Sequence, residues 1–227
     1  MLFRQFFDDL SCTFTYLIGS ETSREAVIID PVLENVDEYL LELNKLNLGL
    51  IKVIETHTHA DHFSGSFKLK DKTNCKTLMG EHTKTEVVEI RVKDEEIIKV
   101  GDLNIKAIHT PGHTLDSYSF LMKDRVFSGD TLLINGTGRT DFQEGSAKDS
   151  YESIFNRLLK LPEKTLLYPA HDYKGEKVST IGKERKFNPR LQVKNMSEYL
   201  YIMNNLNLPK PKLIDVAVER NLKLGAL

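Results

Sequence analysis

Three histidines and an aspartate lie within one short segment, THTHADH. They are His57, His59, Asp61 and His62. Imidazole nitrogens and carboxylate oxygens are ligands that suit zinc, iron or manganese, and a compact loop can direct several of them at one or two ions. Because this spacing is improbable in an ordinary solvated loop, the segment predicts a metal site.

Three more residues with the same ligand chemistry follow other apolar runs. His113 lies in HTPGHT, Asp130 in VFSGDT and His171 in YPAHDY. Each is weak evidence alone, but loops at strand ends are where rigid scaffolds present reactive groups. Together with the first cluster they predict one site built from four strand-end loops, with no comparable residues at other strand ends.

The remaining histidines are expected outside the site. His82 lies in a charged, helix-like stretch and is predicted to be a surface residue. His109, four residues before His113, is predicted to be structural or to support a ligand rather than to be one.

Short strands must deliver these loops. Apolar runs with alternation predict a hairpin of residues 13–19 and 26–29 around a polar turn. Further strands are predicted at the following places: 50–54, 105–108, 118–121, 126–127 and 165–168. The histidine-rich segment follows 50–54 directly.

Amphipathic helices alternate with these strands. Apolar residues at helical spacing predict helices from Asn35 to near Gly49, over 149–160 and over 195–206. Asn35, Asp149 and Asn195 each precede a glutamate by three residues, the spacing of an N-cap and its partner. We therefore expect one mixed α/β domain over residues 1–227.

Composition excludes several classes of protein. The 227 residues carry 31 Lys+Arg against 33 Asp+Glu, with no basic excess for a phosphate backbone, so no nucleic-acid partner is expected. The longest apolar runs have about four residues, against the roughly 20 that a membrane span needs. Cys12 and Cys75 are predicted to be small buried apolar residues rather than a disulfide. The beginning of the chain has no secretory signal pattern, and Asp8 and Asp9 disfavour a transit peptide, so a cytoplasmic location is expected.

The order of the candidate ligands resembles the metallo-β-lactamase superfamily over nearly the whole chain. The pattern His-x-His-x-Asp-His from His57 to His62, followed by His113, Asp130 and His171, is highly specific. The resemblance implies an αββα four-layer sandwich, in which two mixed β-sheets pack face to face with helices outside and the metal site at one edge.

Other segments resemble the persulfide dioxygenases within that superfamily. They are SCTFTYLIG, SREAVIIDPV, GRTDFQ, YPAHDYKG, ERKFNPR and NNLNLPKPK. One departure is Thr137, where many relatives are expected to carry cysteine, and a small polar replacement there is tolerable in packing.

The resemblance implies one Fe(II) per chain, held by His57, His113 and Asp130. Such a triad leaves three positions of an octahedral ion open for a persulfide sulfur, dioxygen and water. The implied reaction converts glutathione persulfide, O2 and water to glutathione and sulfite. His59, Asp61, His62 and His171 would then hold water and orient the ligands.

The glutathione side is also implied by the resemblance, which maps Arg139, Tyr173 and Arg190 onto it. Arginine suits this role because its planar fork can donate two parallel hydrogen bonds to a carboxylate. Asp141 and Asp172 could orient an arginine or a histidine. A homodimer is compatible with the sequence.

A hydroxyacylglutathione hydrolase with a binuclear site of zinc or mixed metals is the competing interpretation. Its second ion would be held by Asp61, His62, Asp130 and His171, all of which are present. Counting ligands does not decide between one iron and two metals; GRTDFQ, the N-terminal hairpin and the short C-terminal region favour the dioxygenase. A noncatalytic persulfide sensor is disfavoured because no residue of the triad is missing.

Overall fold

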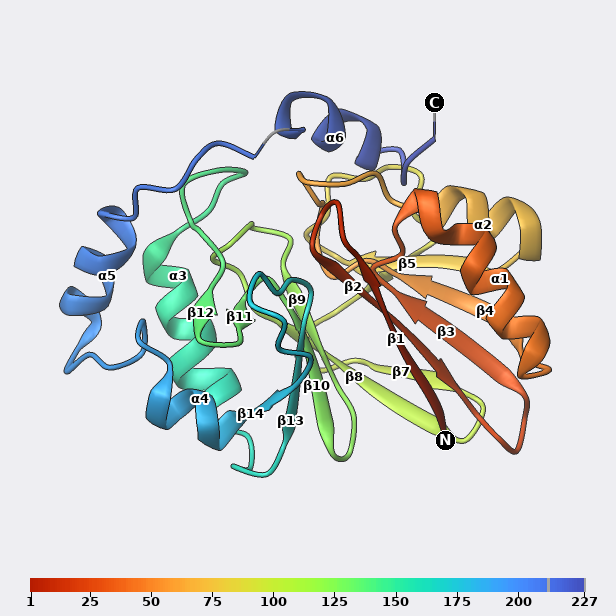
Figure 1. Ribbon diagram of the computed structural model, residues 1–227, viewed down its shortest axis with the longest axis horizontal. Helices are drawn as coiled ribbons and strands as arrows, with labels where there is room; N and C mark the ends of the chain where they lie inside the picture. Colours follow the sequence, from red (N-terminus) through yellow and green to blue (C-terminus); the bar gives the residue numbers. More distant parts are fainter. Residues whose placement is uncertain (212, 227) are drawn as a thin grey trace.

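Two β-sheets pack face to face and helices cover both outer faces in the computed structural model, which describes residues 1–211 and 213–226 (Figure 1). Residue 212, the last of the motif NNLNLPKPK, and residue 227 lie outside the described residues. Both sheets contain parallel and antiparallel pairs, so the expected αββα sandwich of mixed sheets is confirmed. The expectation of a single domain over 1–227 stays a prediction.

The first sheet uses the N-terminal part of the chain. Its strands lie in the order β1 (Leu2–Asp8), β2 (Thr13–Gly19), β3 (Glu25–Ile29), β4 (Gly49–Ile54), β5 (Lys76–Gly80) and β6 (Ile90–Val92). The pairs β1–β2 and β2–β3 are antiparallel, which confirms the predicted hairpin, and the other three pairs are parallel. Because a parallel connection needs a crossover, α1 (Val36–Lys45), after the short 3-10 turn Leu33–Asn35, joins β3 to β4, and α2 (Ser66–Thr73) joins β4 to β5.

The second sheet is built from the middle of the chain. Its order is β14 (Ser179–Thr180), β13 (Leu166–Pro169), β10 (Arg125–Gly129), β9 (Tyr118–Leu121), β8 (Leu103–His109) and β7 (Ile97–Val100). In this sheet β10 and β13 are parallel, and the other four pairs of neighbouring strands are antiparallel. A two-stranded sheet of β11 (Leu132–Leu133) and β12 (Gly136–Thr137) follows β10 and reaches toward the site.

Helices from the second half of the chain cover the outer face of this sheet. They are α3 (Ala147–Tyr151), continued by a π-helical stretch (Glu152–Arg157) and a 3-10 turn (Leu158–Lys160), then α4 (Ile181–Phe187) and α5 (Met196–Asn204). The last helix, α6 (Ile214–Asn221), lies apart from them, across the upper edge of the sandwich in Figure 1. Among the described residues, no helix has the length and hydrophobicity needed to cross a membrane.

Three large apolar clusters hold the layers together. The cluster between the sheets is rich in aromatic side chains, among them Tyr16, Phe120 and Phe127, all fully buried. A second cluster packs α1 and α2 on the first sheet through Tyr39 and Leu69. The third packs α3, its π-helical continuation, α4 and α5 on the second sheet, and includes these side chains: Ile154, Leu158, Leu167, Tyr199 and Met203.

The first residues of three helices show whether the predicted N-caps form. Asn195 accepts a hydrogen bond from the backbone N–H of Glu198 at 3.1 Å, as predicted. Asn35 stands at the N-cap position of α1, but the predicted side-chain cap is wrong, because the side chain makes no capping bond and its amide donates to Asp8 instead. The cap at Asp149 is also wrong: the helix begins earlier, and the hydroxyl of Ser146 accepts the N–H of Asp149.

The two cysteines are both free. Cys75 is buried beneath α2, as expected. Cys12 is only half-buried in the loop between β1 and β2, so the expectation of a buried apolar residue is wrong there.

The cluster between the sheets predicts a large cost for truncating its aromatic side chains. We expect Phe120→Ala to lower the free energy of unfolding by about 3–5 kcal/mol, because Phe120 is fully buried and the cavity cannot collapse against two sheets. Denaturant unfolding measures this. Phe187→Ala is the matched control, since Phe187 is 59% exposed; equal losses in the two variants would contradict the assignment of the core.

Candidate metal centre

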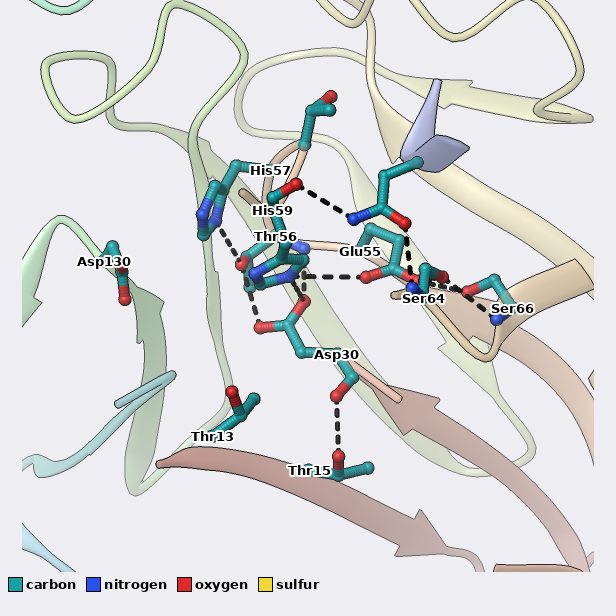
Figure 2. Close-up of polar contacts among 12 residues, drawn as sticks. Thr13, Thr15, Asp30, Glu55, Thr56, His57, His59, Ser64, Ser66 and Asp130 are labelled. Carbon is teal, nitrogen blue, oxygen red and sulfur yellow. Dashed lines mark hydrogen bonds and ion pairs between the residues drawn. The ribbon is translucent and has the colours of Figure 1, made fainter. Parts of the chain in front are cut away.

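The four predicted loops meet at one edge of the two sheets. His57 follows β4 of the first sheet, whereas His113, Asp130 and His171 follow β8, β10 and β13 of the second. A bridge between Thr13 on β2 and His171 joins the sheets at this edge. Figure 2 shows His57 and His59 on the loop after β4, with Asp130 at a neighbouring strand end.

His57, His113 and Asp130, the ligands implied by the resemblance, form one group of candidate metal ligands. One donor atom from each lies within 4.8 Å of the other two. His113 Nε2 is 3.5 Å from Asp130 Oδ2, and the rings of His57 and His113 stand perpendicular, 4.9 Å apart. The structure thus brings this predicted triad together.

Hydrogen bonds on the far side of each imidazole determine which nitrogen is free. Thr56 Oγ1 donates to Asp30 Oδ2 at 2.9 Å and therefore accepts from His57 Nδ1, 3.0 Å away. His113 Nδ1 donates to the backbone carbonyl of Arg139 at 2.8 Å. Both rings consequently turn Nε2, with its lone pair, toward the centre of the group.

Asp130 is held in the same way. Its Oδ1 accepts from His171 Nδ1 at 2.7 Å, which leaves Oδ2 facing His113. Two imidazole nitrogens and one carboxylate oxygen, each fixed from behind, are the donor set of a metal site with three protein ligands on one face. The residues present therefore fit a bound divalent metal.

Burial and neighbouring charges set the protonation states that such a site needs. Burial, followed by the charges of His59 and His113, holds the pKa of His57 well below its usual value, so its imidazole is neutral. Burial alone would raise the pKa of Asp130, but His171 and then His113 lower it well below its usual range. Asp130 is therefore ionised, and a neutral imidazole with a carboxylate is ready to bind a metal.

The loop after β12 approaches this group closely. The backbone N–H of Gly138 donates to the carbonyl of Asp130 at 2.8 Å. A Cβ on Gly138 would lie 2.1 Å from that carbonyl oxygen and 3.0 Å from the Cβ of His113. Only glycine permits this approach, and it places the next residue, Arg139, with its carbonyl against His113.

His171 spans two carboxylates. Its Nδ1 pairs with Asp130, and its Nε2 lies 2.6 Å from Asp61 Oδ2. Burial opposes a charge on this ring, but Asp130 and Asp61 raise its pKa well above the usual value. Asp61 also contacts His62 Nδ1 at 3.2 Å. Donor atoms of His59, Asp61 and His62 form a second group within 4.8 Å.

His59 faces away from the triad. Its Nε2 lies 3.1 Å from Asp30 Oδ1 and 3.4 Å from Glu55 Oε2, and these three buried residues form a third group (Figure 2). Burial lowers the pKa of His59, but Asp30 and Glu55 together raise it well above the usual value. The two histidines of the His-x-His pair therefore belong to different groups.

Arg139 is engaged by its own chain. Its guanidinium binds Asp141 through two hydrogen bonds of 2.7 and 2.8 Å, so Asp141 orients it as expected. The remaining donors reach the carbonyls of Pro209 and Leu208, and the group stacks over Phe142. Its side chain thus ties the segment before α6 to the site.

Arg190 and Tyr173 are the other two residues that the resemblance maps onto the glutathione side. Arg190 Nη1 donates to the backbone carbonyl and the hydroxyl oxygen of Thr137, and within the described ranges its guanidinium forms no ion pair with a carboxylate. Tyr173 is 69% exposed and its ring is parallel to that of His171. Asp172 accepts backbone N–H groups of its own loop rather than orienting an arginine or a histidine, so that expectation is wrong.

The two histidines left out of the predicted site stack on each other, 3.9 Å apart. His82 is exposed as expected, but it lies in a turn rather than a helix, and its Nδ1 contacts the hydroxyl of Tyr118. His109 is half-buried and its Nε2 lies 3.0 Å from the carbonyl of Leu115. The prediction that His109 is structural agrees with these contacts.

Three residues around the site were missed. Asp30 follows the buried strand β3, so the expectation that no other strand end carries a comparable residue is wrong. Glu55 follows β4 in the same way, and both could have been found by that signal. Asn221 on α6 donates to the carbonyls of His59 and His62 and accepts the N–H of Ser64; no local pattern marks it.

Comparison with known families agrees with this geometry. A family model described as the metallo-beta-lactamase superfamily matches residues 12–171. Because the match covers more than half of the chain, the chain belongs to the metallo-β-lactamase superfamily.

Individual relatives identify the family within this superfamily. The mitochondrial persulfide dioxygenase ETHE1 of Homo sapiens is 43% identical over 99% of this chain and 89% of its own length. The crystal structure of ETHE1 from Myxococcus xanthus is 47% identical, covers 100% of both chains and gives a TM-score of 0.98. A probable hydroxyacylglutathione hydrolase of Schizosaccharomyces pombe is 31% identical over 79% of this chain and 82% of its own length. Within the superfamily, the chain belongs to the persulfide dioxygenases.

The contact between Thr56 and His57 predicts an effect on metal affinity. We expect Thr56→Val to weaken metal binding about 10- to 100-fold, because Nδ1 of His57 loses the acceptor that orients its ring. Retention of metal against a competing chelator measures this. Thr56→Ser keeps the hydroxyl and is expected to bind like the wild type; equal retention by the valine and serine variants would contradict the role of this hydrogen bond.

Proposed function

We propose that this chain is a persulfide dioxygenase that converts glutathione persulfide, O2 and water to glutathione and sulfite. One ferrous iron per chain would be held by His57 Nε2, His113 Nε2 and Asp130 Oδ2. The observation that carries the proposal is that these three side chains are each fixed from behind and present one free donor atom to a common space. The full-length similarity to persulfide dioxygenases supports the choice of reaction.

Bound iron would supply the redox chemistry with dioxygen, and three protein ligands leave three further coordination positions. The protein supplies orientation. Thr56 holds the ring of His57, the carbonyl of Arg139 holds that of His113, and His171 holds the carboxylate of Asp130. Because the histidines after β4 are almost completely buried, access is limited to the side bounded by His113 and Asp130, which are only half-buried.

The substrate is anionic, so its carboxylates need fixed cations. Arg190 suits this role best, because it is half-buried, is anchored on Thr137 and has no acidic partner among the described residues. Tyr173 offers an exposed hydroxyl and ring beside His171. Arg139 already binds Asp141. We therefore propose that it contributes to glutathione binding indirectly, by holding the segment before α6 in place.

A hydroxyacylglutathione hydrolase with two metals is the second candidate. Asp61, His62 and His171 could contribute to a second metal site together with Asp130. However, both ring nitrogens of His171 contact carboxylates, Asp130 on one side and Asp61 on the other. His171 thereby supports Asp130, and the higher identity to a persulfide dioxygenase than to the hydrolase favours a single iron.

The human relative is named as mitochondrial, and the cytoplasmic location expected from the sequence stays a prediction for this chain.

Metal content and oxygen uptake on one sample test the proposed function. We expect about one iron per chain and O2 consumption on addition of glutathione persulfide, because one His2Asp face binds one ion. His113→Ala should lose iron and turnover together, whereas His82→Ala, a variant of an exposed histidine outside the site, should lose neither. Pairs of zinc ions with thioester hydrolysis and no O2 uptake would refute the proposal.

The arginine without an acidic partner gives a separate prediction. Arg190→Ala should raise KM for glutathione persulfide about 10- to 100-fold, equivalent to the roughly 1.5–3 kcal/mol of a hydrogen bond to a charged group, with iron content unchanged. Steady-state oxygen uptake measures KM. Arg185→Ala is the control, because Arg185 binds Glu163 instead; a loss of iron in Arg190→Ala would show that its role is misassigned.

A further inference from the structure

Glu55 is a buried carboxylate with no role in the reaction proposed above. It follows β4 directly and is 3% exposed. Its Oε1 accepts hydrogen bonds from the hydroxyls of Ser64 and Ser66, whereas its Oε2 has no hydrogen-bond partner. A carboxylate is costly to bury without a partner for each oxygen, so the free oxygen indicates a specific function.

The free oxygen points at the ring of His59. Oε2 lies 3.4 Å from His59 Nε2, and Asp30 Oδ1 lies 3.1 Å from the same nitrogen (Figure 2). Asp30 is committed elsewhere as well, because it also accepts both the N–H and the hydroxyl of Thr56. Of the two carboxylates, Glu55 is thus the one whose free oxygen serves only His59.

His59 lies close enough to the triad to compete for its metal. Its ring centroid is 4.1 Å from that of His57. Yet the triad group contains His57, His113 and Asp130, whereas the group that contains Asp30 and Glu55 contains His59. The two histidines therefore differ in the direction of Nε2: that of His57 faces the triad, whereas that of His59 faces Asp30 and Glu55.

We propose that Glu55 is a positioning residue that keeps His59 out of the metal coordination sphere. The proposal rests on the mononuclear iron site inferred above. With Glu55 in place, two imidazoles and one carboxylate bind the ion. Without it, His59 turns back toward His57 and adds a third imidazole, which leaves two open positions where persulfide, dioxygen and water need three.

The serine hydroxyls explain how Glu55 keeps its own direction. Ser64 and Ser66 stand at the start of α2, and both donate to Oε1. The backbone of the same loop is fixed by Asn221, which accepts the N–H of Ser64. Glu55 is therefore held by one oxygen while the other remains directed at His59, as a positioning role requires.

The test counts imidazole ligands on the iron-loaded protein by X-ray absorption and a crystal structure. We expect two imidazoles in the wild type and three in Glu55→Gln, which has the same shape but no charge to hold the ring. Glu55→Asp keeps the charge but withdraws it from His59, so it should also show three. In Glu55→Gln/His59→Ala the count should return to two, which identifies the added ligand.

Glu184→Gln is the matched control. Glu184 is also a fully buried glutamate bound by a serine hydroxyl, here Ser179, but its other oxygen accepts from Asn135 and Asn188. Its imidazole count should stay at two. Two imidazoles in whichever of the Glu55 single variants folds would overturn the proposed role of Glu55. A wild type with two metals would instead overturn the mononuclear site on which it rests.

Discussion

The hydrogen bonds of Thr56 are the constraint on which the site depends. Its N–H and hydroxyl donate to Asp30 at the end of β3, and its carbonyl accepts the N–H of Tyr118 at the start of β9. One residue therefore links neighbouring strands of the first sheet to the second sheet, and its hydroxyl also orients His57. A Cβ on Gly129 would lie 2.8 Å from that hydroxyl, so β10 and the aspartate that follows it are fixed to the same point. The two sheets are therefore joined at the edge where the candidate metal ligands lie.

Much of this arrangement follows from sequence patterns, because a strand that is buried on both faces is strongly apolar and ends where polar residues begin. That transition identified the loops of His57, His113, Asp130 and His171. The same transition after β3 was overlooked, since a single aspartate before a proline is usual in a turn. Strand β1 was not predicted because most of its residues are half-buried, and β7 was not predicted because it has only four residues and one of its outward-facing residues is the apolar Ile97. The two wrong caps have a common cause, in that a cap depends on backbone direction that spacing does not specify.

The arginines show what motifs alone cannot determine. The sequence resemblance maps both Arg139 and Arg190 onto the glutathione side and does not distinguish their roles. In the structure Arg139 pairs with Asp141 and holds the segment before α6, whereas Arg190 has, among the described residues, hydrogen bonds to the oxygens of Thr137 alone. Partner choice at a charged side chain depends on residues that lie far away in sequence, and it decides whether the charge is available to a ligand.

Asn221 brings the end of the described chain into the centre of the protein. Its amide binds the carbonyls of His59 and His62 and its oxygen binds the N–H of Ser64, so the backbone of the histidine loop is complete only when α6 docks. During synthesis, the ligand residues leave the ribosome long before Asn221 does. The loop therefore reaches its final shape only after α6 has been synthesised and has docked, and a metal ion meets a finished site only from then on.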